Sequence, residues 1–235
     1  MTDIEQFNEL YEGAFPLDVL KNKTSEEYLA FSTKRGKPVK FVAFPELLNI
    51  IPVVQEYFKY FRDNPYSYLI PCDNYDGTTY GYVMRSVTGK EYRSVFNPGI
   101  EIQPTFGWYD FKDFKKGTPI VLTEGVKDCL AIKRYYPHCL ALLSCKTSNQ
   151  IGELLSKVFT KKVLIGFDND YDKEKNAGSI AFKAAAKALA EHGINCHKLE
   201  VPYYNGEPLK DFGQTFSRPG STIALRMTLK QIELV

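Results

Sequence analysis

Two aspartates separated by one residue, Asp168 and Asp170, follow the apolar run 162–167. In an extended backbone, residues i and i+2 point to the same side, so these two carboxylates can converge on one cation. Mg²⁺ and Mn²⁺ are hard ions that favour oxygen ligands of this kind. The pair therefore predicts half of a divalent-metal site, and a solvated acidic loop is the simpler alternative.

The third aspartate of this stretch, Asp172, belongs to the charged segment 171–176. A calcium loop of the EF-hand type that begins at Asp168 is excluded, because its sixth position would be Lys173 instead of Gly and its twelfth would be Ser179 instead of Glu. We therefore expect Asp172 to be solvated and to lie outside the metal site.

Other acidic residues follow apolar runs in the same region of the chain. Glu124 ends the run 119–124, Asp128 lies one helical turn later, and Asp211 follows Lys210 in a polar loop. Each of them is a weak signal when taken alone. Their combination with the Asp-x-Asp pair is more specific, provided that the fold brings them to one place.

The elements that would position these acids alternate in type beyond residue 117. Apolar strand-like runs alternate with helical periodicity, which predicts an α/β domain with a mostly parallel sheet and helices on both faces. Ligands of such sheets gather at the carboxyl ends of the strands, where Glu124 and Asp168 are both expected. The expected strands are 119–124, 139–145, 162–167 and 196–202, and the expected helices are 126–136, 148–159 and 179–193, the last with Ser179 as N-cap and Gly193 as the C′ residue.

The first 117 residues have a different pattern. Strand-like runs in 66–96 are interrupted by turn signals at 76–77 and 88–89, which predicts an antiparallel meander. The run 52–61 has helical periodicity, and 1–50 reads as mixed helix and hairpin. We therefore expect an α+β lobe ahead of the α/β domain.

The composition is that of a soluble globular protein: the 235 residues are 44% hydrophobic and 25% charged. The net charge of +2 neither requires nor excludes a polyanionic partner. The acidic N-terminus lacks an apolar core and no apolar run could span a bilayer, so we expect no signal peptide and no membrane partner. The five cysteines form no Cys-x-x-Cys pair, which indicates free thiols in a reducing cytoplasm and no zinc ribbon.

The order of these motifs resembles the TOPRIM domain, a Rossmann-like fold shared by DnaG-type primases, topoisomerases and some nucleases. The resemblance covers about residues 118–214. It is carried by the motifs "VLTEGVKD", "LIGFDND", "NAGSIAFKAAAKAL" and "KDFG".

The preceding segment resembles the smaller lobe of the RNA-polymerase core in phage- and bacterial-type DnaG primases. The matching stretches are "YLIPCDNYDGTTYGYVMR", "EYRSVFNPG" and "PTFGWYDF". The resemblance implies a primase catalytic core of phage or plasmid type, with 1–117 as the N-terminal lobe and 118–235 as the TOPRIM domain. The chain departs from the family in several ways: it encodes no zinc-binding domain, it has no P-loop for a fused helicase, and it carries the extra segment 171–176. In addition, the basic residue that usually precedes the segment matching "FGW" is not evident, and residues 1–60 resemble the family poorly.

The resemblance implies nucleotidyl transfer, in which a ribonucleotide 3′-hydroxyl attacks the α-phosphate of an incoming NTP on a single-stranded DNA template. Two Mg²⁺ or Mn²⁺ ions about 4 Å apart would neutralise and align the reacting oxygens. It implies Asp168, Asp170 and Asp211 as metal ligands. Glu124 would be a further ligand or a proton-handling group, and Asp128 would support the site.

Basic residues should bind the triphosphate or the template. Arg85, Lys90 and Arg93 on the meander are candidates, with exposed strand charge as an equally good interpretation. Lys146 and Lys210 are further candidates for phosphate contacts. A replicative helicase and a separate zinc-binding module are the implied partners, and a bacterial cytoplasm is the expected location.

Two other functions stay open at this point. A TOPRIM nuclease would use a similar acidic cluster to hydrolyse phosphodiesters, although the primase-like lobe argues against it. A catalytically inactive primase relative would bind nucleic acid or a replication partner without turnover.

Overall fold

The fold is described from a computed structural model. It describes residues 2–16, 37–43, 66–87, 92–97, 103–144, 147, 149–170, 176–216, 218 and 220–234. The chain divides into two compact units, Met1–Ile100 and Glu101–Val235. Among the described helices, none is long and apolar enough to cross a membrane.

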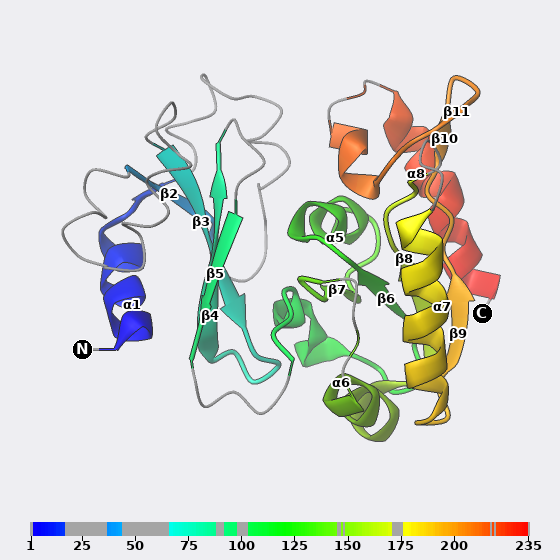
Figure 1. Ribbon diagram of the computed structural model, residues 1–235, viewed down its shortest axis with the longest axis horizontal. Coiled ribbons are helices and arrows are strands. Elements are labelled where there is room, and N and C mark those ends of the chain that lie inside the picture. The colour runs from blue at the N-terminus through cyan, green and yellow to red at the C-terminus, as the bar shows by residue number, and fades with distance from the viewer. Residues whose placement is uncertain are drawn as a thin grey trace. The chain divides into compact units, whose positions relative to one another are not determined.

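In the residues that the structure describes, the first unit consists of an antiparallel sheet with helix α1 against it (Figure 1). The strands follow one another in chain order, which confirms the predicted meander. Helix α1 packs Phe7, Leu10 and Tyr11 against Leu69 and Tyr82 of the sheet. The elements are α1 (Asp3–Gly13), β1 (Phe15–Pro16), β2 (Lys40–Ala43), β3 (Tyr66–Asp73), β4 (Thr79–Ser86) and β5 (Tyr92–Phe96).

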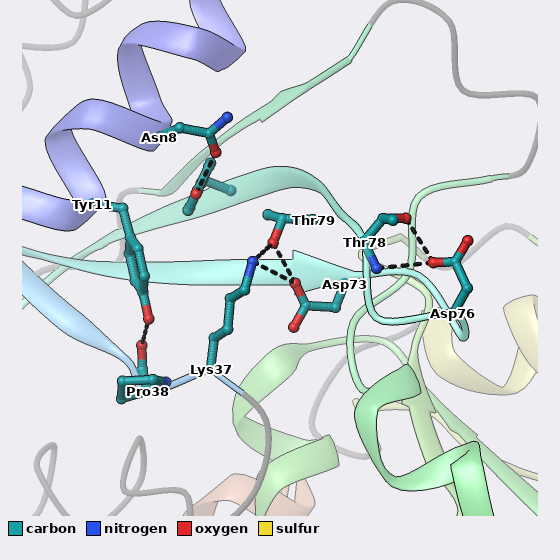
Figure 2. A network of polar contacts seen from close by, with 9 residues as sticks. Asn8, Tyr11, Lys37, Pro38, Asp73, Asp76, Thr78 and Thr79 are labelled. Atoms are coloured by element: carbon teal, nitrogen blue, oxygen red, sulfur yellow. Dashed lines mark hydrogen bonds and ion pairs between the residues drawn. The ribbon is translucent and has the colours of Figure 1, made fainter.

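The turn predicted at 76–77 is present between β3 and β4. Gly77 has a φ of 87°, and the Asp76 carboxylate accepts hydrogen bonds from both the N–H and the hydroxyl of Thr78. Beside it, the Lys37 ammonium donates to the Thr79 hydroxyl and lies 3.9 Å from Asp73 (Figure 2). These contacts fix the end of the β3–β4 hairpin. The expected turn at 88–89 and the expected helix 52–61 lie outside the described residues.

The second unit contains a four-stranded sheet in the order β7-β6-β8-β9, with every neighbouring pair parallel. Helices α5 and α7 lie on opposite faces of this sheet (Figure 1). The predicted α/β class is therefore confirmed. The strands are β6 (Ile120–Thr123), β7 (Cys139–Ala141), β8 (Lys162–Gly166) and β9 (Asn195–Lys198), and a separate hairpin consists of β10 (Tyr203–Tyr204) and β11 (Glu207–Pro208).

Three helices of this unit, α5, α6 and α7, lie close to the expected segments, and α8 was not expected from the sequence. Their bounds are α5 (Val126–Lys133), α6 (Asn149–Leu154), α7 (Ala177–Ala190) and α8 (Ser221–Leu229). The short helical segments are the 3₁₀ segments η2 (Trp108–Asp113), η4 (Phe212–Phe216) and η5 (Lys230–Leu234), and a π-helical turn, η3 (Leu155–Phe159), that continues α6.

Three expected boundaries were wrong. The strand expected at 139–145 ends at Ala141, because Leu143 has a φ of 57° and breaks the extended backbone. The strand expected at 196–202 is only Asn195–Lys198. The N-cap of α7 is Asn176 instead of Ser179, since the Asn176 side chain accepts the Ser179 N–H at 3.0 Å.

Gly193 does end helix α7 as predicted. Its N–H donates to the carbonyl of Ala190 and that of Ile194 to the carbonyl of Leu189, which is the Schellman pattern with Gly193 at C′. The φ of Gly193 is 68°, a conformation that glycine adopts without strain.

Residues 103–117 pack within the second unit. Phe106 forms an isolated antiparallel bridge with Ala141, and Trp108 and Phe111 pack against Phe159. The division of the two lobes that the sequence predicts at residue 117 stays a prediction.

Candidate active site

The acidic residues are brought to one edge of the parallel sheet by its register. Strands β6 and β8 are neighbours, and Thr123 is paired with Gly166 at their carboxyl ends. Glu124 follows directly after β6, and Asp168 lies two residues after the end of β8. The predicted placement of both acids at strand carboxyl ends is therefore observed.

The loop that carries Asp211 is tied to the Asp-x-Asp segment through the backbone. The N–H of Asn169, the residue between the two aspartates, donates to the carbonyl of Lys210 at 2.6 Å. The carboxylate of Asp211 in turn accepts the N–H of Gln214 at 2.8 Å, and the Gln214 side chain accepts the N–H of Lys210 at 2.9 Å. These bonds hold Asp211 beside the end of β8.

Asp128 is a buried acid on helix α5. It lies in the first turn of α5 and is 8% exposed. Its carboxylate accepts the N–H of Gly213 at 2.8 Å, at the start of η4. Asp128 therefore joins helix α5 to the loop of Asp211, and its proximity to the other acids follows from this bond.

The carboxyl groups act on one another electrostatically. The pKa of Asp168 is raised to about 7, first by burial and then by the charges of Asp211 and Glu124, while Lys210 opposes the shift. Asp170 raises it further. Asp211, Glu124 and Asp170 are thus within electrostatic reach of Asp168 at this edge of the sheet.

The pKa of Asp128 is also raised well above its usual range. Burial is the main cause, followed by the charges of Asp211 and Asp168, and the Gly213 N–H acts in the opposite direction. A carboxyl group behaves in this way when anions surround it and no cation balances them.

The close approach of α7 to β8 depends on a glycine. A Cβ atom on Gly178 would lie 1.7 Å from the carbonyl oxygen of Asp168, so no other residue fits here without moving the helix. The Asn176 side chain donates to the side-chain oxygen of Asn169 at 3.1 Å. The start of helix α7 therefore contacts the Asp-x-Asp segment and holds it in position.

The donor set suits a hard divalent cation, because every predicted ligand is a carboxylate. Within the described part of the chain, no three His, Cys, Asp or Glu side chains are already placed to hold one ion together. Asp168 is half-buried and Asp170 is 6% exposed. Asp172 lies outside the described residues.

The basic residues predicted to contact phosphates lie in different parts of the chain. Lys210 lies at the acidic edge, as its effect on the pKa of Asp168 indicates. Arg85 is on β4 of the first unit, where its backbone pairs with Tyr68 and Tyr92. The backbone of Arg93 is on β5, while its side chain, Lys90 and Lys146 lie outside what the structure describes.

Four residues at this edge were not singled out from the sequence. Asn169, Asn176 and Gln214 hold the loops together, and their amides gave no signal because such residues are ordinary in polar loops. Lys127 lies against Gly213, whose Cβ would be 2.8 Å from the Lys127 Cγ. The only sequence signal for Lys127 was its position directly before Asp128.

Comparisons with known proteins agree with this geometry. The family model described as Toprim-like matches residues 121–213, the segment that contains Glu124, the Asp-x-Asp pair and Asp211. This segment is therefore similar to Toprim-like domains. No curated protein matches the chain in sequence.

Solved structures are similar over nearly the whole chain. The Aquifex aeolicus primase, in its zinc-binding and RNA polymerase domains, matches with a TM-score of 0.66 at 21% identity over 96% of this chain. The E. coli primase catalytic core matches with a TM-score of 0.60 at 17% identity, over 98% of this chain and 80% of that one. A DnaG primase catalytic domain bound to single-stranded DNA has a TM-score of 0.58 at 16% identity, over 97% of this chain and 77% of that one.

The chain therefore has the fold of a DnaG-type primase catalytic core. It spans 60% of the length of the Aquifex chain. The likeness extends through the first unit, which the Toprim-like match does not cover.

Proposed function

We propose that this protein is the catalytic core of a DNA primase, which joins ribonucleotides into short RNA primers on single-stranded DNA. The observation that carries the proposal is the acidic edge of the parallel sheet, where burial and the charges of Asp211 and Glu124 raise the pKa of Asp168, in a fold shared with primase cores. The first unit supports a primase over a TOPRIM nuclease, since it is part of the fold shared with primases.

Asp168, Asp170 and Asp211 would hold Mg²⁺ or Mn²⁺, with Glu124 as a further ligand or as the group that handles a proton. When bound, a pair of such ions neutralises the phosphates and aligns the attacking and leaving oxygens. Asp128, held by the Gly213 N–H, would keep the loop of Asp211 in place. Lys210 and Lys127 would contact the triphosphate from the same edge.

The supporting partners are inferred from the same likeness. The Aquifex aeolicus primase contains a zinc-binding domain ahead of its polymerase domain. No such cysteine spacing exists in this sequence, so a zinc-binding module would act from elsewhere. A replicative helicase is the second proposed partner, and a phage- or plasmid-encoded protein of the bacterial cytoplasm is the proposed origin.

Primer synthesis tests the proposal directly. The full chain is incubated with labelled NTPs, single-stranded DNA templates of varied sequence and either Mg²⁺ or Mn²⁺. We expect short RNA products that disappear with EDTA and fall at least about a hundredfold in the variants Asp168→Asn and Asp170→Asn.

Three outcomes separate the functions. Products that require the metal and both aspartates support a primase. Cleavage of DNA without NTPs would instead make the protein a nuclease. Binding of DNA without any synthesis, even when helicase and zinc module are supplied, would make it an inactive relative.

A further inference from the structure

Two arginines and two aromatic rings form a second cluster in the second unit, distinct from the five acids of the acidic edge. The guanidinium of Arg134 lies 5.8 Å from the ring centre of Tyr135 and 5.2 Å from that of Phe216. The guanidinium of Arg226 lies 5.5 Å from the same Tyr135 ring. We call these four residues the Arg–Tyr surface.

Three elements build this surface, and hydrogen bonds hold them together. Arg134 and Tyr135 follow α5, Phe216 ends η4, and Arg226 is on α8. The buried Ser221 hydroxyl lies 3.2 Å from the carbonyl of Thr215 in η4, which fixes the start of α8 to that segment.

The chain segment that forms part of this surface carries an excess of positive charge. Between Asp211 and Glu233 the sequence has three cationic residues, Arg218, Arg226 and Lys230, and no acidic one. Among the side chains that the structure describes, no carboxylate lies within 4.0 Å of the guanidinium of Arg134 or Arg226.

Lys133, the residue before Arg134, shows the opposite behaviour. Its ammonium is buried and lies 2.8 Å from the Asp110 carboxylate, and it also donates to two backbone carbonyls. Lys133 is therefore used to hold the fold. Arg134 and Arg226 are exposed, so their charges are available to a ligand.

Helix α8 also has an outward face that is apolar. Its inward residues Ser221, Leu225 and Leu229 are buried, whereas Ile223 and Met227 are 68% and 66% exposed on either side of Arg226. Apolar and aromatic groups beside exposed guanidinium groups are the ingredients of surfaces that bind unpaired bases and phosphates together.

We propose that the Arg–Tyr surface binds single-stranded nucleic acid, with the guanidinium groups on the phosphates and the exposed Tyr135 ring, Ile223 and Met227 against the bases. A phosphate near Arg134 and Arg226 would relieve the repulsion of two like charges that converge on one ring. The proposed primase function is needed only to say which strand is bound, the DNA template or the new RNA, and not for the binding itself.

Fluorescence anisotropy of the full chain with a fluorescein-labelled oligodeoxythymidylate of about 20 nucleotides tests the proposal. In the variant Arg134→Ala/Arg226→Ala we expect Kd to rise by roughly tenfold or more, and the slope of log K against log salt to fall by about 1.4. The variant Arg134→Lys/Arg226→Lys should keep the salt slope and lose part of the affinity, since lysine keeps the charge but not the planar stacking group.

The matched control is Lys183→Ala/Lys187→Ala, which removes the same charge from exposed positions of α7. It should leave Kd unchanged within about twofold. Each variant's melting temperature should stay close to that of the unaltered protein, which shows that the fold is intact. A labelled oligoribonucleotide in the same assay tells which strand binds more tightly.

The proposal is overturned if the unaltered protein does not bind the oligonucleotides, or if Arg134→Ala/Arg226→Ala binds them as tightly as the unaltered protein. It is also overturned if the α7 control variant loses as much affinity as the double arginine variant. Asp168→Asn should bind normally. A protein that makes no primers but still loses affinity in the arginine variants would refute the proposed function and leave this surface assignment standing.

Discussion

At the scale of the residue, the unusual property of the site is the proton affinity of Asp168. Its pKa of about 7 lies well above the ordinary value of 3.8, because burial and the charges of Asp211 and Glu124 disfavour its ionised form. A carboxyl group whose pKa is raised by folding stabilises the folded state at low pH and loses that contribution as the pH rises through its folded pKa. The window for this loss is therefore between about pH 4 and pH 7.

This shift predicts a pH-dependent effect of Asp168→Asn on stability. In EDTA, the variant and the unaltered protein should melt at similar temperatures near about pH 4, and the variant should be the more stable one near about pH 8, because it has no charge to bury. Added Mg²⁺ should raise the melting temperature of the unaltered protein more than that of the variant. Thermal scans over this range measure both effects, and a variant that is less stable at the higher pH would contradict the prediction.

The buried pair of Lys133 and Asp110 supplies a second prediction at this scale. Both side chains are at most 5% exposed, so removing one partner leaves the other as an isolated buried charge. We expect Lys133→Met to lower the free energy of unfolding by about 3–5 kcal/mol. Denaturant unfolding measures the loss, and the double variant Lys133→Met/Asp110→Asn should recover part of it.

At the scale of the element, the packing of α7 against the end of β8 decides where the Asp-x-Asp pair lies. In Gly178→Ala the new methyl group would collide with the carbonyl oxygen of Asp168. Because this oxygen belongs to the backbone, only a shift of the helix could relieve the collision. We expect this variant to lose most primer synthesis and to be clearly less stable. Gly13→Ala is the matched control, because nothing lies within 4 Å of a Cβ at that position. Equal activity of the two variants would show that α7 does not position the site.

Much of the secondary structure of the second unit could be predicted from the sequence. Apolar runs and helical periodicity identified the four parallel strands and helices α5, α6 and α7, because burial of one face leaves a local pattern. The ends of elements were less accurate: Asn176 and Ser179 are both good N-caps, and only the backbone decides between them. The tie between Asn169 and Lys210 joins residues far apart in the chain, so no local pattern could reveal it.

At the scale of the whole molecule, the second unit has a core of its own, made of its sheet and the helices on both faces. We expect a fragment of residues 101–235 to fold alone with a single cooperative melting transition, because this compact unit has a buried core of its own. The fragment should not make primers, since the proposed template contacts of the first unit are missing. Circular dichroism and the primer assay test both halves of this expectation, and a fragment that stays unfolded would refute it.

The length of helix α5 matters for both of the proposed sites. It carries Asp128 in its first turn, and Arg134 follows its last residue, Lys133. Six residues of helical rise separate the two positions by about 9 Å along the axis, and each residue turns the helix by about 100°. An insertion or deletion of one residue in α5 would therefore rotate the arginine relative to the aspartate. The length of α5 therefore sets both the distance and the rotation between the proposed metal site and the proposed nucleic-acid surface.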